Sequence, residues 1–425
     1  DAGGFGLTET ENVISCGSYT GNGVVAGPSV TLGYEPQWVL VKSSTVVGSN
    51  WYLMDIMRGM AQTQCNELYA DLAAAEVAQS KTIIPTATGF NVATNDAYIN
   101  NNGSTYTYIA IRRGPMAVPT LGTSVFSPVT RTGTGATATG TAGFAPDLVI
   151  PVNRPHDYTG ATPWFDKLRG VNQALYSNTT GAEENRADTF TFSNTGVTFG
   201  TNAIANSSSA SYINWYFQRA PGFFDEVCYT GTGVARTVAH NLAAVPELMI
   251  VKSRTVGGIR NWAVYSSALG ATKFLLLNLT DAVGTNTYWN NTAPTASVFS
   301  IDASTLVNNS PPETYVAYLF ATCAGVSKVG SYTGTGALQT VACGFTSGAR
   351  YVLIKRTDST GDWYVWDSAR GITSGNDPYL LLNSTAAEVT GTNYVDTDTT
   401  GFKVTAAAPA GINANGGTYI FLAIA

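Results

Sequence analysis

The chain has 425 residues, of which only 12% are charged (22 basic and 28 acidic), and its formal net charge is −6. The charged fraction is about half of that in ordinary soluble domains, and the scarcity of Lys and Arg excludes a surface for phosphate backbones, so we expect no nucleic-acid partner. No stretch approaches the ~20 apolar residues of a membrane span, so we expect no membrane insertion.

Residues suited to metal binding or acid–base chemistry are scarce. The chain has two histidines, His156 and His240, and five cysteines without a CxxC pair, so we expect no metal site and no cofactor. Cys228 and Cys323 stand near the two ends of one repeat and could form a disulfide, although buried thiols are the default expectation. Motifs of serine hydrolases, zinc peptidases and P-loop enzymes are absent, and we expect no catalytic residue.

Four landmarks recur in the same order four times, which is the signature of tandem repeats. The first is a Tyr-Thr-Gly-x-Gly turn (with Arg in place of Tyr in the second copy), whose last glycines are 112, 98 and 103 residues apart, at Gly23, Gly135, Gly233 and Gly336. An apolar run follows at 36–42, 146–152, 246–252 and 349–355. A tryptophan comes next, at Trp51, Trp164, Trp262 and Trp363. Each copy closes on a Tyr-rich apolar strand, at 106–111, 212–217, 315–320 and 419–424.

These landmarks predict four repeats of about 100 residues, preceded by a short N-terminal segment. The segment spans 1–15, and repeats 1 to 4 span 16–113, 124–219, 226–322 and 328–425. Because the numbering opens at Asp1 without a methionine, we expect a trimmed or partly represented N-terminus. Short connections that contain proline predict neighbouring repeats packed at fixed angles.

The residue pattern within each repeat is typical of β structure. Short runs rich in Val, Ile, Tyr, Phe and Trp alternate with clusters of Gly, Asn, Thr and Pro, as in strands joined by turns. Helical periodicity is nearly absent, and its best stretch, 66–79, predicts one or two helical turns at most. We therefore predict an all-β chain of four tandem antiparallel β-sandwiches, jelly-roll or lectin-like, in which the glycine turns close hairpins.

Three of the four repeats carry Asp-x-x-Arg-Gly and, further on, a glutamate. These residues are Asp55, Arg58 and Glu76; Asp166, Arg169 and Glu183; and Asp367, Arg370 and Glu388. Repeat 3 has Ser266, Leu269 and Val283 at these positions, so all three ionisable groups are lost together. Because removing one member of a buried ion cluster leaves the other charges buried without a partner, we predict a structural Asp–Arg–Glu network. The alternative, a carboxylate pair for glycoside hydrolysis, needs one protonated acid, which the arginine disfavours.

The tryptophans of the repeats differ in their context. We expect the recurrent ones to be core residues, since each opens an alternating apolar strand. Trp289 has no counterpart in the other repeats and lies in a polar loop, Tyr288-Trp289-Asn290-Asn291. An aromatic face beside amides suits stacking on a sugar, so these four residues are candidate glycan-binding residues. The alternative is a tryptophan packed against a neighbouring segment or subunit.

The repeat signature resembles repeats of virion proteins from tailed bacteriophages, of the tail-fibre or minor structural type. The resemblance rests on Ser-Tyr-Thr-Gly-x-Gly, Pro-x-Trp-Val-x-x-Lys, Asp-x-x-Arg-Gly, Leu-x-x-Asn-x-Thr, Gly-Phe and Tyr-x-Ala, and is best at 18–42, 331–355 and 367–371. Repeat 2 lacks the Tyr and the Lys, and repeat 3 lacks Asp-x-x-Arg. The resemblance implies a virion component of the tail or its fibres and brings no catalytic residue with it.

We therefore expect a non-enzymatic structural protein of a phage virion, on the tail rather than the capsid, that contributes to recognition of host-surface glycans. Its expected partners are other virion proteins, further copies of itself in a homo-oligomer, and a host glycan. A capsid decoration or head-fibre protein without receptor binding is one alternative, and it predicts flat apolar patches and no pocket. The others are a secreted carbohydrate-binding repeat protein and a polysaccharide depolymerase, which would need two carboxylates within roughly 10 Å in a groove.

Overall fold

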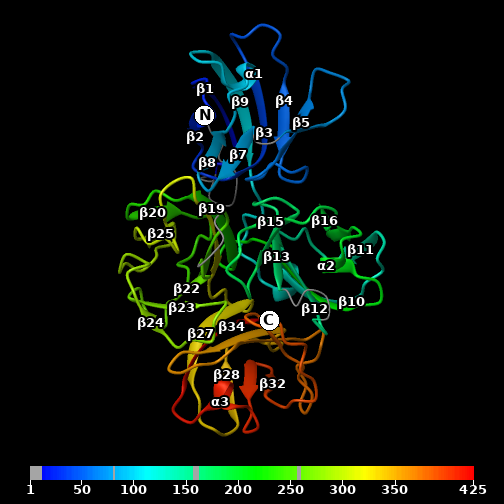
Figure 1. The fold of residues 1–425 in the computed structure, drawn as a ribbon, viewed down its shortest axis with the longest axis vertical. Coiled ribbons are helices and arrows are strands. Elements are labelled where there is room, and N and C mark those ends of the chain that lie inside the picture. Colours follow the sequence, from blue (N-terminus) through cyan, green and yellow to red (C-terminus); the bar gives the residue numbers. More distant parts are fainter. Residues whose placement is uncertain (1–11, 80–81, 157–161, 256–259) are drawn as a thin grey trace. The chain divides into compact units, whose positions relative to one another are not determined.

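The structure is a computed structural model that describes residues 12–79, 82–156, 162–255 and 260–425. The chain divides into two compact units, which are treated separately below. Unit 1 is Asp1–Met116 with Asp166–Val171 and Ala239–Asn241, and unit 2 is Ala117–Phe165, Asn172–Val238 and Leu242–Ala425. Unit 1 therefore holds repeat 1, and unit 2 holds nearly all of repeats 2, 3 and 4 (Figure 1). The predicted segment 1–15 lies outside the described residues except for 12–15.

The prediction of an all-β chain with antiparallel sheets is confirmed. Among the described residues, each repeat contributes one large sheet built to the same plan, with six strands in repeats 1 to 3 and five in repeat 4. The order in repeat 1 is β1(Ile14–Thr20), β9(Thr105–Arg112), β3(Pro36–Ser43), β4(Tyr52–Asp55), β5(Cys65–Tyr69), β6(Val77–Gln79). In repeat 2 it is β10(Phe126–Thr132), β18(Ser211–Phe217), β12(Leu148–Asn153), β13(Pro163–Asp166), β14(Gln173–Tyr176), β15(Glu184–Asn185).

The other two large sheets follow the same plan. In repeat 3 the order is β19(Phe224–Thr230), β26(Thr314–Phe320), β21(Leu248–Ser253), β22(Ala263–Ser266), β23(Lys273–Leu276), β24(Gly284–Thr285). In repeat 4 it is β27(Ser327–Thr333), β34(Thr418–Ile424), β29(Tyr351–Arg356), β30(Trp363–Asp367), β31(Leu380–Leu381).

A small sheet covers one face of each large sheet. The small sheets are β2(Ser29–Thr31), β8(Gly89–Val92), β7(Ile83–Thr86); β11(Ala138–Thr141), β17(Gly196–Phe199), β16(Phe190–Ser193); β20(Arg236–Ala239), β25(Val298–Ile301); and β28(Gln339–Ala342), β33(Gly401–Val404), β32(Val395–Asp398). In repeat 1, Val39 and Val41 of β3 pack with Val30 of β2 and Phe90 of β8 in one buried cluster. Because strand side chains alternate between faces, this inner core leaves the opposite, outer face of each large sheet for other contacts.

The prediction of helical turns at 66–79 is wrong. Residues 66–79 form no helical turns but belong to β5, a loop and β6, because Glu67 and Cys65 point into the inner core and strand pairing satisfies the backbone. The helical turns are instead α1(Ala97–Asn100), α2(Ala203–Asn206) and α3(Ala410–Asn413), with a 3₁₀ turn at Gly122–Ser124.

The glycine turns are crossovers between the two layers rather than hairpins, since each one joins a large-sheet strand to a small-sheet strand. A buried asparagine about 75 residues downstream holds each turn. Its Oδ1 accepts the backbone N–H between the two glycines, at Asn22–Asn100 (2.8 Å), Thr134–Asn206 (2.9 Å), Thr232–Asn308 (2.9 Å) and Thr335–Asn413 (3.0 Å). The motif therefore fixes the connection between the sheets.

The register of one tryptophan also differs from the prediction. The backbone N–H groups of Trp51, Trp262 and Trp363 donate to Asp71, Asn278 and Asn383, at 3.0, 3.0 and 2.8 Å. In repeat 2 the residue in this position is Thr162, whose N–H donates to Asn178 at 3.3 Å. Trp164 lies two residues further along the strand and hence on the same outer face.

Candidate functional site

The outer faces of the three large sheets in unit 2 pack on one another around a shared hydrophobic core. Every member is 4% exposed or less. Each repeat contributes a matching row, namely Ile150, Trp164, Leu175 and Trp215 from repeat 2; Ile250, Val264, Leu275 and Tyr318 from repeat 3; and Leu353, Val365, Leu380 and Leu422 from repeat 4. The repeats are therefore joined by burial of the faces that their own small sheets leave open.

Backbone hydrogen bonds close the three repeats into a ring. From each repeat to the next, the N–H donors and carbonyl acceptors are Glu183 to Arg254 (2.7 Å), Val283 to Thr357 (2.8 Å) and Glu388 to Arg154 (2.8 Å). The three donors occupy equivalent positions in their repeats, and so do the three acceptors. The ring therefore has approximate threefold symmetry, and we name its contacts junction 2/3, junction 3/4 and junction 4/2 after the repeats that they join.

Side chains add further bonds at each junction. The indole Nε1 of Trp262 donates to the Tyr176 carbonyl across junction 2/3, and that of Trp363 donates to the Leu276 carbonyl across junction 3/4, both at 3.0 Å. At junction 4/2, where repeat 2 has Thr162 in place of tryptophan, Ser177 Oγ donates to the Leu382 carbonyl instead, at 2.7 Å.

The predicted Asp–Arg–Glu network is present in repeats 1 and 4. Arg58 pairs with Asp55 at 2.6 Å and with Glu76 at 3.0 Å, and Arg370 pairs with Asp367 at 2.7 Å and with Glu388 at 3.2 Å. In repeat 2, Arg169 pairs with Asp166, and both side chains are fully buried. In each pair the aspartate also accepts the arginine's backbone N–H, which fixes the turn that ends in glycine.

Sequence reasoning missed that the glutamate also binds an arginine of the next repeat. Glu183 pairs with Arg254 across junction 2/3 at 3.0 Å, and Glu388 pairs with Arg154 across junction 4/2 at 2.6 Å. The available signal was the residue two places after the apolar run, which is Arg154 in repeat 2 and Arg254 in repeat 3 but Thr357 in repeat 4.

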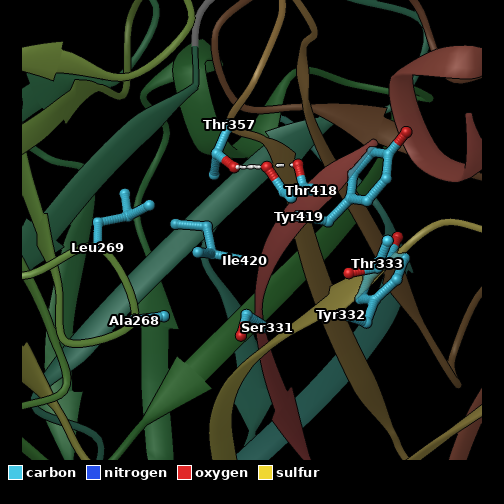
Figure 2. A pocket seen from close by; sticks show the side chains of 9 residues that line it. All are labelled: Ala268, Leu269, Ser331, Tyr332, Thr333, Thr357, Thr418, Tyr419 and Ile420. Atoms are coloured by element: carbon cyan, nitrogen blue, oxygen red, sulfur yellow. Dashed lines mark hydrogen bonds between the residues drawn. The ribbon is translucent and has the colours of Figure 1, made fainter. Parts of the chain in front are cut away.

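At junction 3/4 the described residues form no counterpart of this ion network. Leu269 replaces the arginine of Asp-x-x-Arg, Val283 replaces the glutamate, and Thr357 replaces the arginine from the next repeat. A half-open pocket of about 450 Å³ lies at this junction. Leu269 and Thr357, two of the three replaced positions, line it together with Ala268, Ser331, Tyr332, Thr333, Thr418, Tyr419 and Ile420 (Figure 2).

The pocket presents hydroxyl groups beside an apolar wall. Thr357 and Thr418 share a 2.6 Å hydrogen bond between their hydroxyls (Figure 2), and Leu269 and Ile420 supply the apolar side. The rings of Tyr332 and Tyr419 point away and stack in the inner core of repeat 4, where burial raises the pKa of both phenols. Among the described residues that line the pocket, none is acidic, basic or histidine.

The predicted sugar-stacking role of Trp289 is wrong. Its ring is fully buried in the inner core of repeat 3, packs edge-on against Tyr265, and donates from Nε1 to the Lys273 carbonyl at 3.0 Å. Asn290 and Asn291 are exposed in the loop with left-handed φ angles of 48°, and the Tyr288 ring packs on Phe274. The loop inserts its tryptophan inward because the two-stranded small sheet of repeat 3 leaves room for it.

Two buried lysines at the junctions predict that stability rises in alkaline solution. Burial lowers the pKa of Lys252 and of Lys355 to about 8, against about 10.4 in an unfolded chain. Between about pH 8 and about pH 10 the folded chain has lost protons that the unfolded chain still holds, so the free energy of unfolding increases, by on the order of 1 kcal/mol per pH unit for each lysine. Urea titrations across this range should show a shallower rise for Lys355→Met, and equal slopes would contradict the assignment.

The described residues offer few other sites. They contain no group of three or more His, Cys, Asp or Glu side chains that could hold a metal ion, and no helix long and apolar enough to cross a membrane. Cys228 and Cys323 are thiols, so the disulfide between them is not formed.

Fold and junctions together show an all-β repeat protein in which the large-sheet faces of repeats 2, 3 and 4 assemble around a pseudo-threefold axis. The chain belongs to the family of the domain of unknown function DUF7483, which matches residues 7–115 and 122–425. The break between the two matched ranges falls where units 1 and 2 divide. No curated protein matches the chain.

Proposed function

We propose that this chain is a non-enzymatic structural protein of a bacteriophage virion, associated with the tail, which binds a neutral saccharide of the host surface at junction 3/4. The observation that carries the proposal is the asymmetry of the ring. Ion pairs bridge two of its three junctions, whereas the third has a hydroxyl-lined pocket in their place.

The chemistry of the pocket favours a neutral, hydroxyl-rich ligand. A volume of about 450 Å³ lies within the range of small-molecule sites. Thr418 and Ser331 offer hydroxyls that both donate and accept, the buried Thr357 holds the Thr418 hydroxyl in place, and Leu269 suits the apolar C–H face of a sugar ring. A charged ligand would lose its hydration without gaining an opposite charge from the lining.

The same chemistry supports binding rather than hydrolysis. Glycosidases place two carboxyl groups on either side of the scissile bond, and the described lining of the pocket includes none. The candidate acids Glu183 and Glu388 are instead paired with arginines at the other two junctions.

The tail location rests on the repeat signature and on the presence of a pocket. A decoration protein without receptor binding would need flat apolar patches and no ligand site. Antibody labelling of the source virion tests the location, and we expect label at the tail or its fibres. Label spread over the capsid lattice, or no label on the particle, would overturn this part of the proposal.

A double variant that restores an ion pair should abolish saccharide binding. Leu269→Arg with Val283→Glu introduces the arginine–glutamate pair that repeats 1 and 4 carry, so the pocket should fill while the ring stays folded. Saturation-transfer NMR with methyl glucoside, galactoside, mannoside and N-acetylglucosaminide should detect binding to the wild type, weakened at least about tenfold in the variant.

The matched control is Leu338→Arg, which makes the same Leu-to-Arg change as at position 269 but at a side chain that is 62% exposed and outside the pocket. This control should bind as the wild type does. Binding that survives in the double variant, or a wild type that binds none of the four glycosides, would overturn the saccharide assignment.

A further inference from the structure

Repeat 1 carries on its outer face the same apolar row that repeats 2, 3 and 4 bury in their shared core. Its strand pairing places Ile109 opposite Leu40, Leu40 opposite Leu53, and Leu53 opposite Leu68. The same pairing in repeat 3 aligns Tyr318, Ile250, Val264 and Leu275, and in repeat 4 it aligns Leu422, Leu353, Val365 and Leu380. With Trp51 and Ile14, this row forms the surface that we call the repeat-1 face.

The repeat-1 face is uncovered, although its counterparts are not. Trp51 is 41% exposed, against 0% for Trp262 and 1% for Trp363, which occupy the same position. Ile109 is 37% exposed, whereas Tyr318 and Leu422 are fully buried. Leu40, Leu53 and Leu68 between them are half-buried, and a partly exposed apolar row of this kind marks an interaction site.

The ion network next to this face is also incompletely buried. The Arg58 side chain is 23% exposed, whereas the equivalent Arg370, which lies beside a neighbouring repeat at junction 4/2, is 0% exposed. Both arginines have the same aspartate and glutamate partners within their repeats. A neighbouring repeat therefore covers the ion network of repeat 4, whereas the equivalent network of repeat 1 is left partly exposed.

We propose that the repeat-1 face joins three copies of this chain into a homotrimer, in which three repeats 1 close a ring like that of repeats 2, 3 and 4. A head-to-tail contact that repeats by a rotation of one third of a turn closes after three members. Unit 2 forms this contact three times with three different sequences, so the contact geometry tolerates sequence variation. Three identical copies of repeat 1 would form the same contact with exact threefold symmetry.

Both halves of each junction bond are present in repeat 1. Trp51 stands where Trp262 and Trp363 donate, and Tyr69 stands where Tyr176 and Leu276 accept. Each Trp51 indole should therefore donate to the Tyr69 carbonyl of the next copy. By the same equivalence, the Glu76 N–H should donate to the Ser44 carbonyl of the next copy.

The mass of the full chain in solution tests the proposal. Light scattering coupled to size exclusion should give three times the chain mass for the wild type and one chain mass for Trp51→Glu, because the glutamate would be buried without a partner. The matched control is Val24→Glu, at a 51% exposed side chain in the glycine turn of the same repeat, and it should remain trimeric. Circular dichroism verifies that both variants are folded.

A second readout needs no variant. Cys16 is the exposed cysteine and pairs with Ile109 on the repeat-1 face, so its thiol should be covered in the trimer. Maleimide labelling should be slow at micromolar chain concentration and should accelerate on dilution as the trimer dissociates. A wild type with the mass of one or two chains, a trimer that survives Trp51→Glu, or labelling that is equally fast at all concentrations would overturn the proposal.

Discussion

Replacing Glu388 with alanine is expected to lower the free energy of unfolding of unit 2 by about 3 kcal/mol. The Glu388 carboxylate binds Arg154 of repeat 2 at 2.6 Å and Arg370 of its own repeat at 3.2 Å. The Arg370 side chain is fully buried, so the substitution leaves a desolvated guanidinium without one of its two carboxylate partners. Removing one member of a buried ion cluster costs more than the whole cluster contributes.

Urea unfolding monitored by tryptophan fluorescence measures this loss, and Glu184→Ala is the matched control. Glu184 forms an ion pair with Arg186 in which both side chains are more than 40% exposed, so its removal should cost under about 1 kcal/mol. Equal destabilisation by the two substitutions would contradict the view that the junction pairs hold the ring together.

Replacing Trp363 with alanine is expected to destabilise unit 2 by about 3–5 kcal/mol. The indole is buried in the core shared by repeats 2, 3 and 4, donates to the Leu276 carbonyl across junction 3/4, and lies 5.9 Å from the Lys355 ammonium. Alanine leaves a cavity that three separate sheets line, and collapse around it would require all of them to move.

Trp363→Phe separates packing from hydrogen bonding in the same assay. A phenyl ring fills most of the space of the indole while the Nε1–H donor is lost, so the Leu276 carbonyl is left without that bond and the cost should fall to about 1–3 kcal/mol. If alanine costs no more than phenylalanine, the shared core contributes little to stability and the ring would not be one cooperative unit.

The antiparallel β structure was accessible from the sequence because it depends on local patterns. Alternating apolar residues specify strands, and glycines with φ near +67°, such as Gly135 and Gly233, specify turns. The Asp-x-x-Arg turn was equally accessible, since Asp367 and Arg370 are three residues apart and their pairing is local.

The contacts between repeats were not accessible in this way. Arg154 and Glu388 are 234 residues apart, and nothing local indicates that the ring places them side by side. The joint loss of Arg and Glu in repeat 3 indicated a coupled network, but the pocket at that place is also lined by Thr357 of the next repeat. The polar context of Trp289 suggested exposure, but the space that receives its ring is created by a missing small-sheet strand.

One surface, the outer face of the large sheet, therefore accounts for the features discussed above. In unit 2 this face forms the shared core, and its edges form the three junctions. At junction 3/4 the ion-pair residues are replaced, and the candidate saccharide pocket lies there. In repeat 1 the same surface carries the apolar row without a cover. The central claim is that this face closes rings of three repeats, within one chain or between chains.

A cryo-EM reconstruction of the full-length chain tests this claim most directly. We predict a particle with threefold symmetry through repeat 1, in which the Trp51 indole of each copy contacts the Tyr69 backbone of the next. A single-chain particle, or a twofold dimer in which the repeat-1 face stays open to solvent, would contradict it.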